Sequence, residues 1–183
     1  MAENTSQLTK FNPLIITLHW LMLLLIVAVY VFMEFRGIFP KGSEPREFMK
    51  ALHFMLGMSV FFLVLLRVVV RFSTKVPDII PEPKSIEKLL AKLMHIALYV
   101  FMIGMPLLGW LMLSANGKTV PFFGLQLPML IAENKDLGKL LHDVHEIGAS
   151  LGYVLLGGHA LAALFHHYVK KDNTLLRMSF LRK

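Results

Sequence analysis

Residues 145–169 have the sequence HEIGASLGYVLLGGHALAALFHHYV, an apolar segment that contains four histidines. Between Glu146 and Lys170 there are 23 residues without Asp, Glu, Lys or Arg. About 20 such residues span the hydrocarbon core of a bilayer as a helix. The segment therefore predicts a transmembrane helix, and histidines at membrane depth are costly enough to indicate a function.

Three further uncharged runs occupy residues 11–33, 51–66 and 93–117. Of the 183 residues, 56% are hydrophobic and only 17% are charged, whereas a soluble domain usually has about 25% charged residues. We therefore predict an all-α fold in which residues 1–183 form one transmembrane four-helix bundle. The expected helices span about 11–35, 48–71, 89–114 and 141–169.

The charged residues predict how the bundle lies in the membrane. The N-terminal tail, the connection between the second and third helices and the C-terminal tail hold 12 bases and 5 acids, whereas the other two connections hold 7 of each. Because bases favour the cytoplasmic side, we expect a multi-pass protein with both termini in the cytoplasm. The net charge of +7 does not indicate binding to nucleic acid, since the bases lie at membrane edges rather than in one stripe.

The absence of cysteine narrows the redox chemistry of the chain. It excludes iron–sulfur clusters, covalently attached c-type haem and thiolate-ligated haem. Any redox centre must therefore be held by histidine or methionine, and the chain has eight histidines.

The spacing of four histidines predicts two layers of metal ligands. His145 and His159 are fourteen residues apart, which on a helix gives about 21 Å of depth and nearly a whole number of turns. On the predicted helices, His53 lies at the depth of His145, and His19 lies at the depth of His159. Each layer then offers two imidazoles from different helices, as bis-histidine ligation of a haem iron requires.

We therefore predict two haems, one ligated by His53 and His145, the other by His19 and His159. The alternative is that these histidines form hydrogen bonds between helices without a cofactor. A zinc site is disfavoured, because the two pairs lie too far apart to complete one tetrahedral shell.

Small residues close to the predicted ligands suit a flat macrocycle. Gly57 lies one turn after His53, Gly148 and Gly152 follow His145, and Gly157 and Gly158 precede His159. We expect these small residues to leave room for a macrocycle.

Other polar residues lie close to the layer of His19 and His159, which we call the inner layer because it is nearer the predicted cytoplasmic side. His166 lies seven residues beyond His159 and continues the same helix face about 10 Å further. There it is placed to hydrogen-bond a quinone carbonyl and relay its proton, and stabilisation by the helix dipole is an equal alternative. Arg67 is expected to pair with a haem propionate and Arg71 to polarise the other quinone carbonyl, although snorkelling would explain both arginines. His95 is expected to bond a propionate or the backbone rather than iron.

Six strings along the chain carry a resemblance to a known family. They are Leu18-His-Trp20, Met33-Glu-Phe-Arg-Gly-Ile-Phe-Pro40, Leu93-Met-His-Ile-Ala-Leu-Tyr99, His145-Glu146, His166-His-Tyr168 and Lys171-Asp-Asn-Thr-Leu-Leu-Arg-Met178. Through them the chain resembles, almost from end to end, the bacterial cytochrome b561 family of the inner membrane. The resemblance implies two haems b in a four-helix bundle and a ubiquinone close to the inner haem. The family's four ligands fall on His19, His53, His145 and His159.

Superoxide-oxidising members of this family pass electrons from periplasmic superoxide through both haems to the quinone. The resemblance thus implies a superoxide:ubiquinone oxidoreductase that contacts superoxide, ubiquinone and membrane lipid and needs no obligate protein partner. Because superoxide is an anion, we expect Arg36 and Lys118 in the outer connections to steer it electrostatically. The alternative is a cytochrome b that relays electrons between quinol and a periplasmic or membrane partner.

Overall fold

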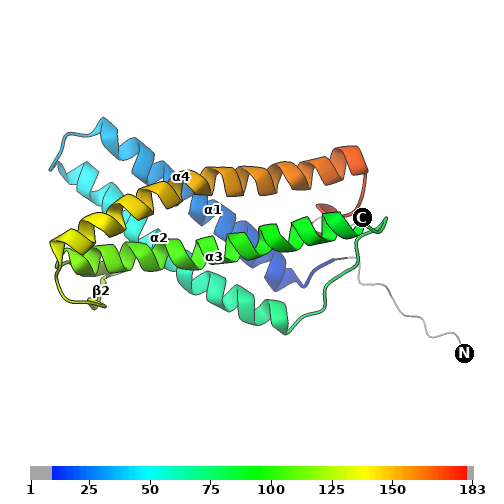
Figure 1. Cartoon of the computed structure of the whole chain (residues 1–183), viewed down its shortest axis with the longest axis horizontal. Helices are drawn as coiled ribbons and strands as arrows, with labels where there is room; N and C mark the ends of the chain where they lie inside the picture. The colour runs from blue at the N-terminus through cyan, green and yellow to red at the C-terminus, as the bar shows by residue number, and fades with distance from the viewer. Residues whose placement is uncertain (1–9, 181–183) are drawn as a thin grey trace, which may run out of the picture.

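The computed structural model describes residues 10–180, and within them four long helices form a bundle (Figure 1). The helices are α1 (Pro13–Phe35), α2 (Glu44–Phe72), α3 (Ser85–Ala115) and α4 (Lys135–Phe165). Three short helical turns are η1 (Arg36–Ile38), η2 (His166–Lys170) and η3 (Leu176–Met178). Each long helix is long and apolar enough to cross a membrane. The prediction of an all-α transmembrane four-helix bundle is therefore confirmed.

α2, α3 and α4 begin before their uncharged runs because their first turns are polar, whereas α1 begins within its run. The side chain of Asn12 accepts a hydrogen bond from the backbone N–H of Leu14 at the start of α1. Asn134 caps α4 in the same way through the N–H of Leu137. α2 begins at Glu44, an acidic residue that interacts favourably with the positive end of the helix dipole. These polar turns lie at the membrane edges and leave the apolar runs to cross it.

Apolar side chains fill the centre of the bundle and also cover its outside. The buried cluster at the centre consists of Met22, Ile26, Val60, Val64, Leu98 and Met102. On the outer surface, Leu24, Val100 and Val154 are 66–71% exposed. An apolar surface of this extent suits lipid rather than water.

One end of the bundle, which we call the hairpin end, is covered by the connection between α3 and α4. This connection contains an antiparallel hairpin of β1 (Val120–Phe122) and β2 (Leu125–Leu127). Positive φ angles at Phe123 (47°) and Gly124 (86°) form its tight turn. Val120 is buried and packs the hairpin onto α2 and α3. The sequence predicted no strands here, since each strand has only three residues and β1 contains a proline.

The opposite end, which we call the terminal end, holds both ends of the described chain (Figure 1). After η2, the chain folds back as residues 171–180, which we call the C-terminal segment. The carbonyl of Arg177 accepts a hydrogen bond from the N–H of Phe11 at 3.1 Å, and the carbonyl of Met178 accepts one from Trp20 Nε1 at 2.8 Å. The C-terminal segment is therefore joined to the first turns of α1.

α1, α3 and α4 approach closely where α4 carries a glycine. A Cβ atom on Gly152 would lie 2.0 Å from Tyr30 Oη and 2.5 Å from the ring of Phe101. The Tyr30 hydroxyl also donates to the backbone carbonyl of Ala149 at 2.8 Å. Any side chain at position 152 would therefore displace an aromatic ring from the helix interface.

We expect Gly152→Ala to destabilise the bundle by about 1–3 kcal/mol, the usual cost of overpacking a core. Gly104 on α3 is a matched control, because a Cβ there meets nothing within 4 Å, and Gly104→Ala should cause no such loss. Thermal unfolding in detergent, followed by circular dichroism, measures both variants. Equal unfolding midpoints would contradict the close approach at Gly152.

Candidate functional site

The four histidines predicted as ligands lie in two pairs, each between two helices. The ring centroids of His53 on α2 and His145 on α4 are 6.3 Å apart, and we call these residues the hairpin-end pair. Those of His19 on α1 and His159 on α4 are 6.2 Å apart, and these form the terminal-end pair. A metal–imidazole bond is about 2 Å long and a ring centroid lies about 1 Å beyond its nitrogen, so two imidazoles across one metal have centroids about 6 Å apart. Both pairs therefore fit one iron between two rings.

The four predicted ligands lie in two separate pairs, at two levels of α4. Within residues 10–180, no group of three or more His, Asp or Glu side chains is arranged to hold a metal ion. Zinc needs about four such ligands around one ion. The geometry thus favours an axial pair on a planar cofactor over a tetrahedral zinc site.

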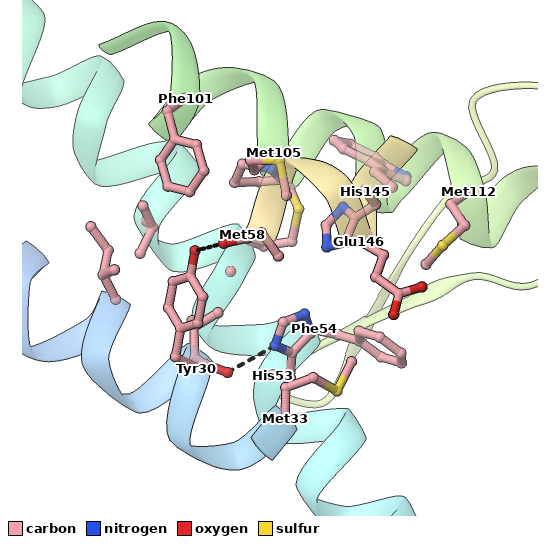
Figure 2. A pocket seen from close by; sticks show the side chains of 18 of the residues that line it. Tyr30, Met33, His53, Phe54, Met58, Phe101, Met105, Met112, His145 and Glu146 are labelled. Atoms are coloured by element: carbon pink, nitrogen blue, oxygen red, sulfur yellow. Dashed lines mark hydrogen bonds between the residues drawn. The ribbon is translucent and has the colours of Figure 1, made fainter. Parts of the chain in front are cut away.

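A cavity of about 420 Å³ lies beside the hairpin-end pair. Figure 2 shows the rings of His53 and His145 facing each other across it. Aromatic rings and thioethers form much of the remaining wall, from Tyr30, Phe101, Met33, Met58, Met105 and Met112. A wide apolar wall with a few polar groups is suited to a flat, mostly apolar ligand.

The backbone of α1 fixes the orientation of one ligand. His53 Nδ1 lies 3.0 Å from the carbonyl oxygen of Val29. A carbonyl only accepts hydrogen bonds, so Nδ1 carries the hydrogen and Nε2 keeps its lone pair. Metal-ligating histidines are commonly held in this way, with one nitrogen bonded to the protein and the other free for the metal.

Of the five glycines predicted to leave room for a ring, Gly57 and Gly157 have open space beside them, whereas Gly148 and Gly152 do not. Gly57 lines the cavity, and a Cβ on it or on Gly157 would meet nothing within 4 Å. A Cβ on Gly158 would make an ordinary contact with Met94 at 3.6 Å. A Cβ on Gly148 would lie 2.5 Å from Met105 Sδ, and Gly152 is covered by Tyr30. Spacing along one helix cannot show which neighbouring side chain fills the space above each glycine.

The two bases predicted to steer an anion lie in different places. Arg36 lines the cavity, and its guanidinium lies 2.7 Å from Met33 Sδ. Lys118 is not among the described residues that line the cavity, and its charge acts instead on Glu47 of α2. Only Arg36 is therefore placed to attract an anion to this cavity directly.

Two acidic residues at the cavity were not among the predicted site residues. Glu34 and Glu146 line it, and Tyr153 Oη donates to Glu34 Oε1 at 2.7 Å. Figure 2 shows the Glu146 side chain beside the hairpin-end pair. Each glutamate directly flanks an uncharged run. That position in the sequence was the one feature that could have indicated a carboxylate near the end of a membrane-spanning helix. The cavity is thus lined by both positive and negative side chains. Arg36 can therefore attract an anion only over a short distance.

Three imidazoles from three helices meet near the terminal end. The ring centroid of His95 on α3 lies 5.7 Å from that of His159, beside the terminal-end pair. Among the described residues, nothing forms a hydrogen bond with the buried His19 Nδ1. A buried nitrogen without a partner costs free energy that a bound group would recover.

Arg67 reaches the same level from α2. Its Nε is buried without a hydrogen-bond partner, and its charge acts on His19 and His159. Within residues 10–180, no carboxylate forms a salt bridge with it. Because a buried guanidinium without a counter-ion is strongly unfavourable, this position favours an anionic group such as a haem propionate.

Beyond this level, His166 contacts a carboxylate that the sequence analysis did not single out. His166 Nδ1 lies 2.5 Å from Oδ2 of Asp172, whose side chain is only 4% exposed. Burial opposes ionisation of Asp172, but hydrogen bonds from His166 and Thr174 outweigh it and lower the pKa of the carboxyl. Asp172 lies past the end of α4, so helical periodicity gave no signal for this contact.

Arg71 is held inside the terminal end. Its guanidinium lies 5.7 Å from the ring centroid of Phe11, and Arg177 lies 5.3 Å from the same centroid. Arg177 is buried and donates to the carbonyl of Pro77. Contact with an aromatic face stabilises a guanidinium in such a site, so Arg71 does not simply extend into water.

Four apolar helices with imidazoles paired between them define a class, the membrane cytochromes b. Over residues 10–180, the chain matches the family described as prokaryotic cytochrome b561. It is 39% identical to cytochrome b561 homolog 1 of Escherichia coli over 96% of this chain and 100% of that protein.

Two further relatives extend the comparison. The probable superoxide oxidase CybB of Yersinia pestis is 38% identical, over 92% of this chain and 95% of its own. Cytochrome b562 of Cereibacter sphaeroides is 30% identical, over 92% of this chain and 94% of its own. The chain therefore belongs to the prokaryotic cytochrome b561 family of bacterial membrane proteins, which carry haem b and transfer electrons.

Proposed function

We propose that the protein is a di-haem cytochrome b that oxidises superoxide to dioxygen at the hairpin end and passes the electrons to ubiquinone at the terminal end. The observation that carries the proposal is the presence of two imidazole pairs at two levels of one apolar bundle. The two ring centroids are 6.3 Å apart in the hairpin-end pair and 6.2 Å apart in the terminal-end pair. One pair at each level supports two haems, ligated by His19, His53, His145 and His159. Haem b would supply reversible one-electron transfer at its iron.

The proposed orientation places the terminal end in the cytoplasm and the hairpin end in the periplasm, across the inner membrane. The segments at the terminal end hold 12 bases and 5 acids, as the cytoplasmic side favours. Three of these charged residues, Glu3, Arg182 and Lys183, lie outside the described residues. The remaining 10 bases and 4 acids still give an excess of bases.

Superoxide as the electron donor is supported by the Yersinia pestis relative that is named a probable superoxide oxidase. The oxidation removes one electron from a small anion and requires neither a nucleophile nor a general base. It does require that the anion reach the haem edge. Arg36, which lines the cavity beside the hairpin-end pair, would supply local attraction.

Ubiquinone is proposed to bind at the terminal end, next to the level of His19 and His159. His166 would hydrogen-bond one carbonyl, and Arg71 would polarise the other. Arg67 would pair with a haem propionate, which would compensate its buried charge. The tail of a quinone would reach this level from the lipid without crossing the polar ends of the bundle.

A second candidate function is relay of electrons between quinol and a periplasmic or membrane partner. The charge around the cavity favours it, because Glu34 and Glu146 line the same cavity as Arg36 and oppose the approach of an anion. Stopped-flow mixing of the purified protein with superoxide discriminates the two functions. Rapid reduction of the haems supports superoxide oxidation, and its absence supports the relay.

Replacing either member of a pair should remove the same haem. We expect His53→Ala and His145→Ala to lose one haem, and His19→Ala and His159→Ala to lose the other. Haem content by the pyridine haemochrome assay should halve, and the residual spectra should fall into two classes. His95→Ala is the control at the same level and should keep both haems. Different residual spectra within one pair, or loss of a haem from His95→Ala, would show that the pairing is wrong.

Arg36→Ser should slow haem reduction by superoxide by roughly a few-fold at low ionic strength and weaken its dependence on salt, because exposed charges act through screened attraction. Lys118→Ser is the matched control and should have the smaller effect, since Lys118 does not line the cavity. Stopped-flow rates at several ionic strengths measure both variants. An equal or larger effect of Lys118→Ser would place the approach of superoxide elsewhere.

His166→Ala should leave both haem spectra and haem reduction by superoxide unchanged, and slow electron transfer to ubiquinone. Loss of one hydrogen bond to a charged group costs about 1.5–3 kcal/mol, which is roughly one to two decades in rate. His167→Ala is the control, because that neighbouring ring contacts Tyr168 instead, with centroids 4.8 Å apart. Normal quinone reduction in His166→Ala, or loss of a haem, would contradict the proposed quinone site.

A further inference from the structure

Asp172 and His166 form a buried acid–imidazole pair at the terminal end. Asp172 Oδ2 accepts a hydrogen bond from His166 Nδ1 at 2.5 Å, and Oδ1 accepts one from the backbone N–H of Thr174 at 2.9 Å. The Asp172 side chain is 4% exposed and that of His166 is 22% exposed. Both carboxylate oxygens are therefore engaged, and one of them is directed at the imidazole.

The backbone is shaped to make this contact. α4 ends in the π-helical turn η2, a form that often marks functional sites. Lys171 follows in the left-handed conformation, with a φ of 56°, and reverses the chain so that the Asp172 N–H donates to the carbonyl of His166 at 3.2 Å. Asn173 then exchanges backbone and side-chain hydrogen bonds with Ile80. The carboxylate is thus anchored from the connection between α2 and α3.

We propose that Asp172 is a positioning residue for quinone reduction, which holds the Nδ1–H of His166 and stabilises the imidazolium whose Nε2–H donates to a quinone carbonyl. This inference rests on the proposed function, in which His166 contacts the quinone. It adds Asp172 to the proposed quinone site, assigns the protonated form to His166, and states that the proton moves from Nε2 of His166 to the quinone.

The chemistry follows from the donors and acceptors available. A carboxylate only accepts, so Nδ1 of His166 is the donor and Nε2 is the nitrogen left for a ligand. A neutral ring would present a lone pair at Nε2, which cannot bond a carbonyl oxygen. The imidazolium presents Nε2–H, and the adjacent carboxylate compensates its charge.

The proton balance is complete. Reduction of ubiquinone to ubiquinol takes two electrons, which two superoxide ions supply as they become two dioxygen molecules, and two protons. One proton passes from Nε2 of His166 to the carbonyl oxygen, and the ring stays bound to Asp172 through Nδ1–H. Water at the terminal end returns that proton to Nε2 and supplies the other to the second oxygen.

The other charged groups near this pair also have partners of their own. Glu87 on α3 forms a salt bridge with Lys170 on η2 at 2.5 Å and also interacts electrostatically with His166. Arg177 interacts with Asp172 and also with Asp78. Of these carboxylates, Asp172 is the one that is hydrogen-bonded to His166, so Asp172 is the residue to replace.

Asp172→Asn keeps the shape and an acceptor for Nδ1–H but removes the negative charge. Without that charge the imidazolium loses its counter-charge, so quinone reduction at neutral pH should slow by about tenfold and recover as the pH is lowered. Haem spectra and haem reduction by superoxide should not change. In protein labelled with nitrogen-15 histidine, the signals of the His166 ring nitrogens should shift. An unchanged pH profile with unchanged His166 signals would overturn the inference.

Asn173→Ala is the matched control, because it loosens the same segment and keeps the carboxylate. It should leave the pH profile unchanged, and Asp172→Glu should restore the profile that Asp172→Asn loses. A shift in Asn173→Ala as large as that in Asp172→Asn would show that Asp172 has only a structural role.

The His166→Ala variant separates the two proposals. Normal quinone reduction in His166→Ala overturns the proposed quinone site. Slow reduction in His166→Ala with an unaltered profile in Asp172→Asn overturns only the role of Asp172. In the double variant, Asp172→Asn should slow quinone reduction no further than His166→Ala alone.

Discussion

An imidazole inside a bilayer has no water to bond, so each buried ring in this bundle needs a partner from the protein or from a bound group. α4 carries two such rings, and they determine which helices must face it at each level. α2 supplies His53 opposite His145, and α1 supplies His19 opposite His159, at nearly equal centroid separations. The close contact of Gly152 with Tyr30 lies between these levels and brings α1 and α4 together. The packing of the helices thus follows from pairing the histidines.

The two ends of the bundle present different electrostatic surroundings. At the hairpin end, an open cavity carries Arg36 together with Glu34 and Glu146. At the terminal end, the C-terminal segment covers the bundle, and Arg67 and Arg177 lie partly or fully buried. Excess positive charge in a low-dielectric region stabilises anions more strongly than the same charge in water. The terminal end is therefore the better site for groups that gain negative charge.

Much of this architecture could be predicted because membranes impose simple rules. Uncharged runs gave the four helices, and a separation of fourteen residues placed His145 and His159 on one face at two levels. Contacts between residues on either side of a chain reversal leave no periodic pattern in the sequence, so they could not be predicted in this way. The His166–Asp172 contact requires a π turn and a left-handed Lys171, and the strands of the hairpin are too short to leave a pattern. Gly148 was misjudged because only the packed structure shows that Met105 fills the space beside it.

The sharing of α4 between both histidine pairs has a consequence for how the protein acquires its cofactors. Under the proposed di-haem function, the first haem to bind at either level fixes the rotation and depth of α4. When the second haem arrives, α4 is already ordered, so binding of the second haem costs less conformational entropy than binding of the first. Loading should therefore be cooperative, and chains that carry a single haem should be rarer than independent sites would give. Slow haem supply would then yield a mixture of empty and full proteins rather than a population of half-filled ones.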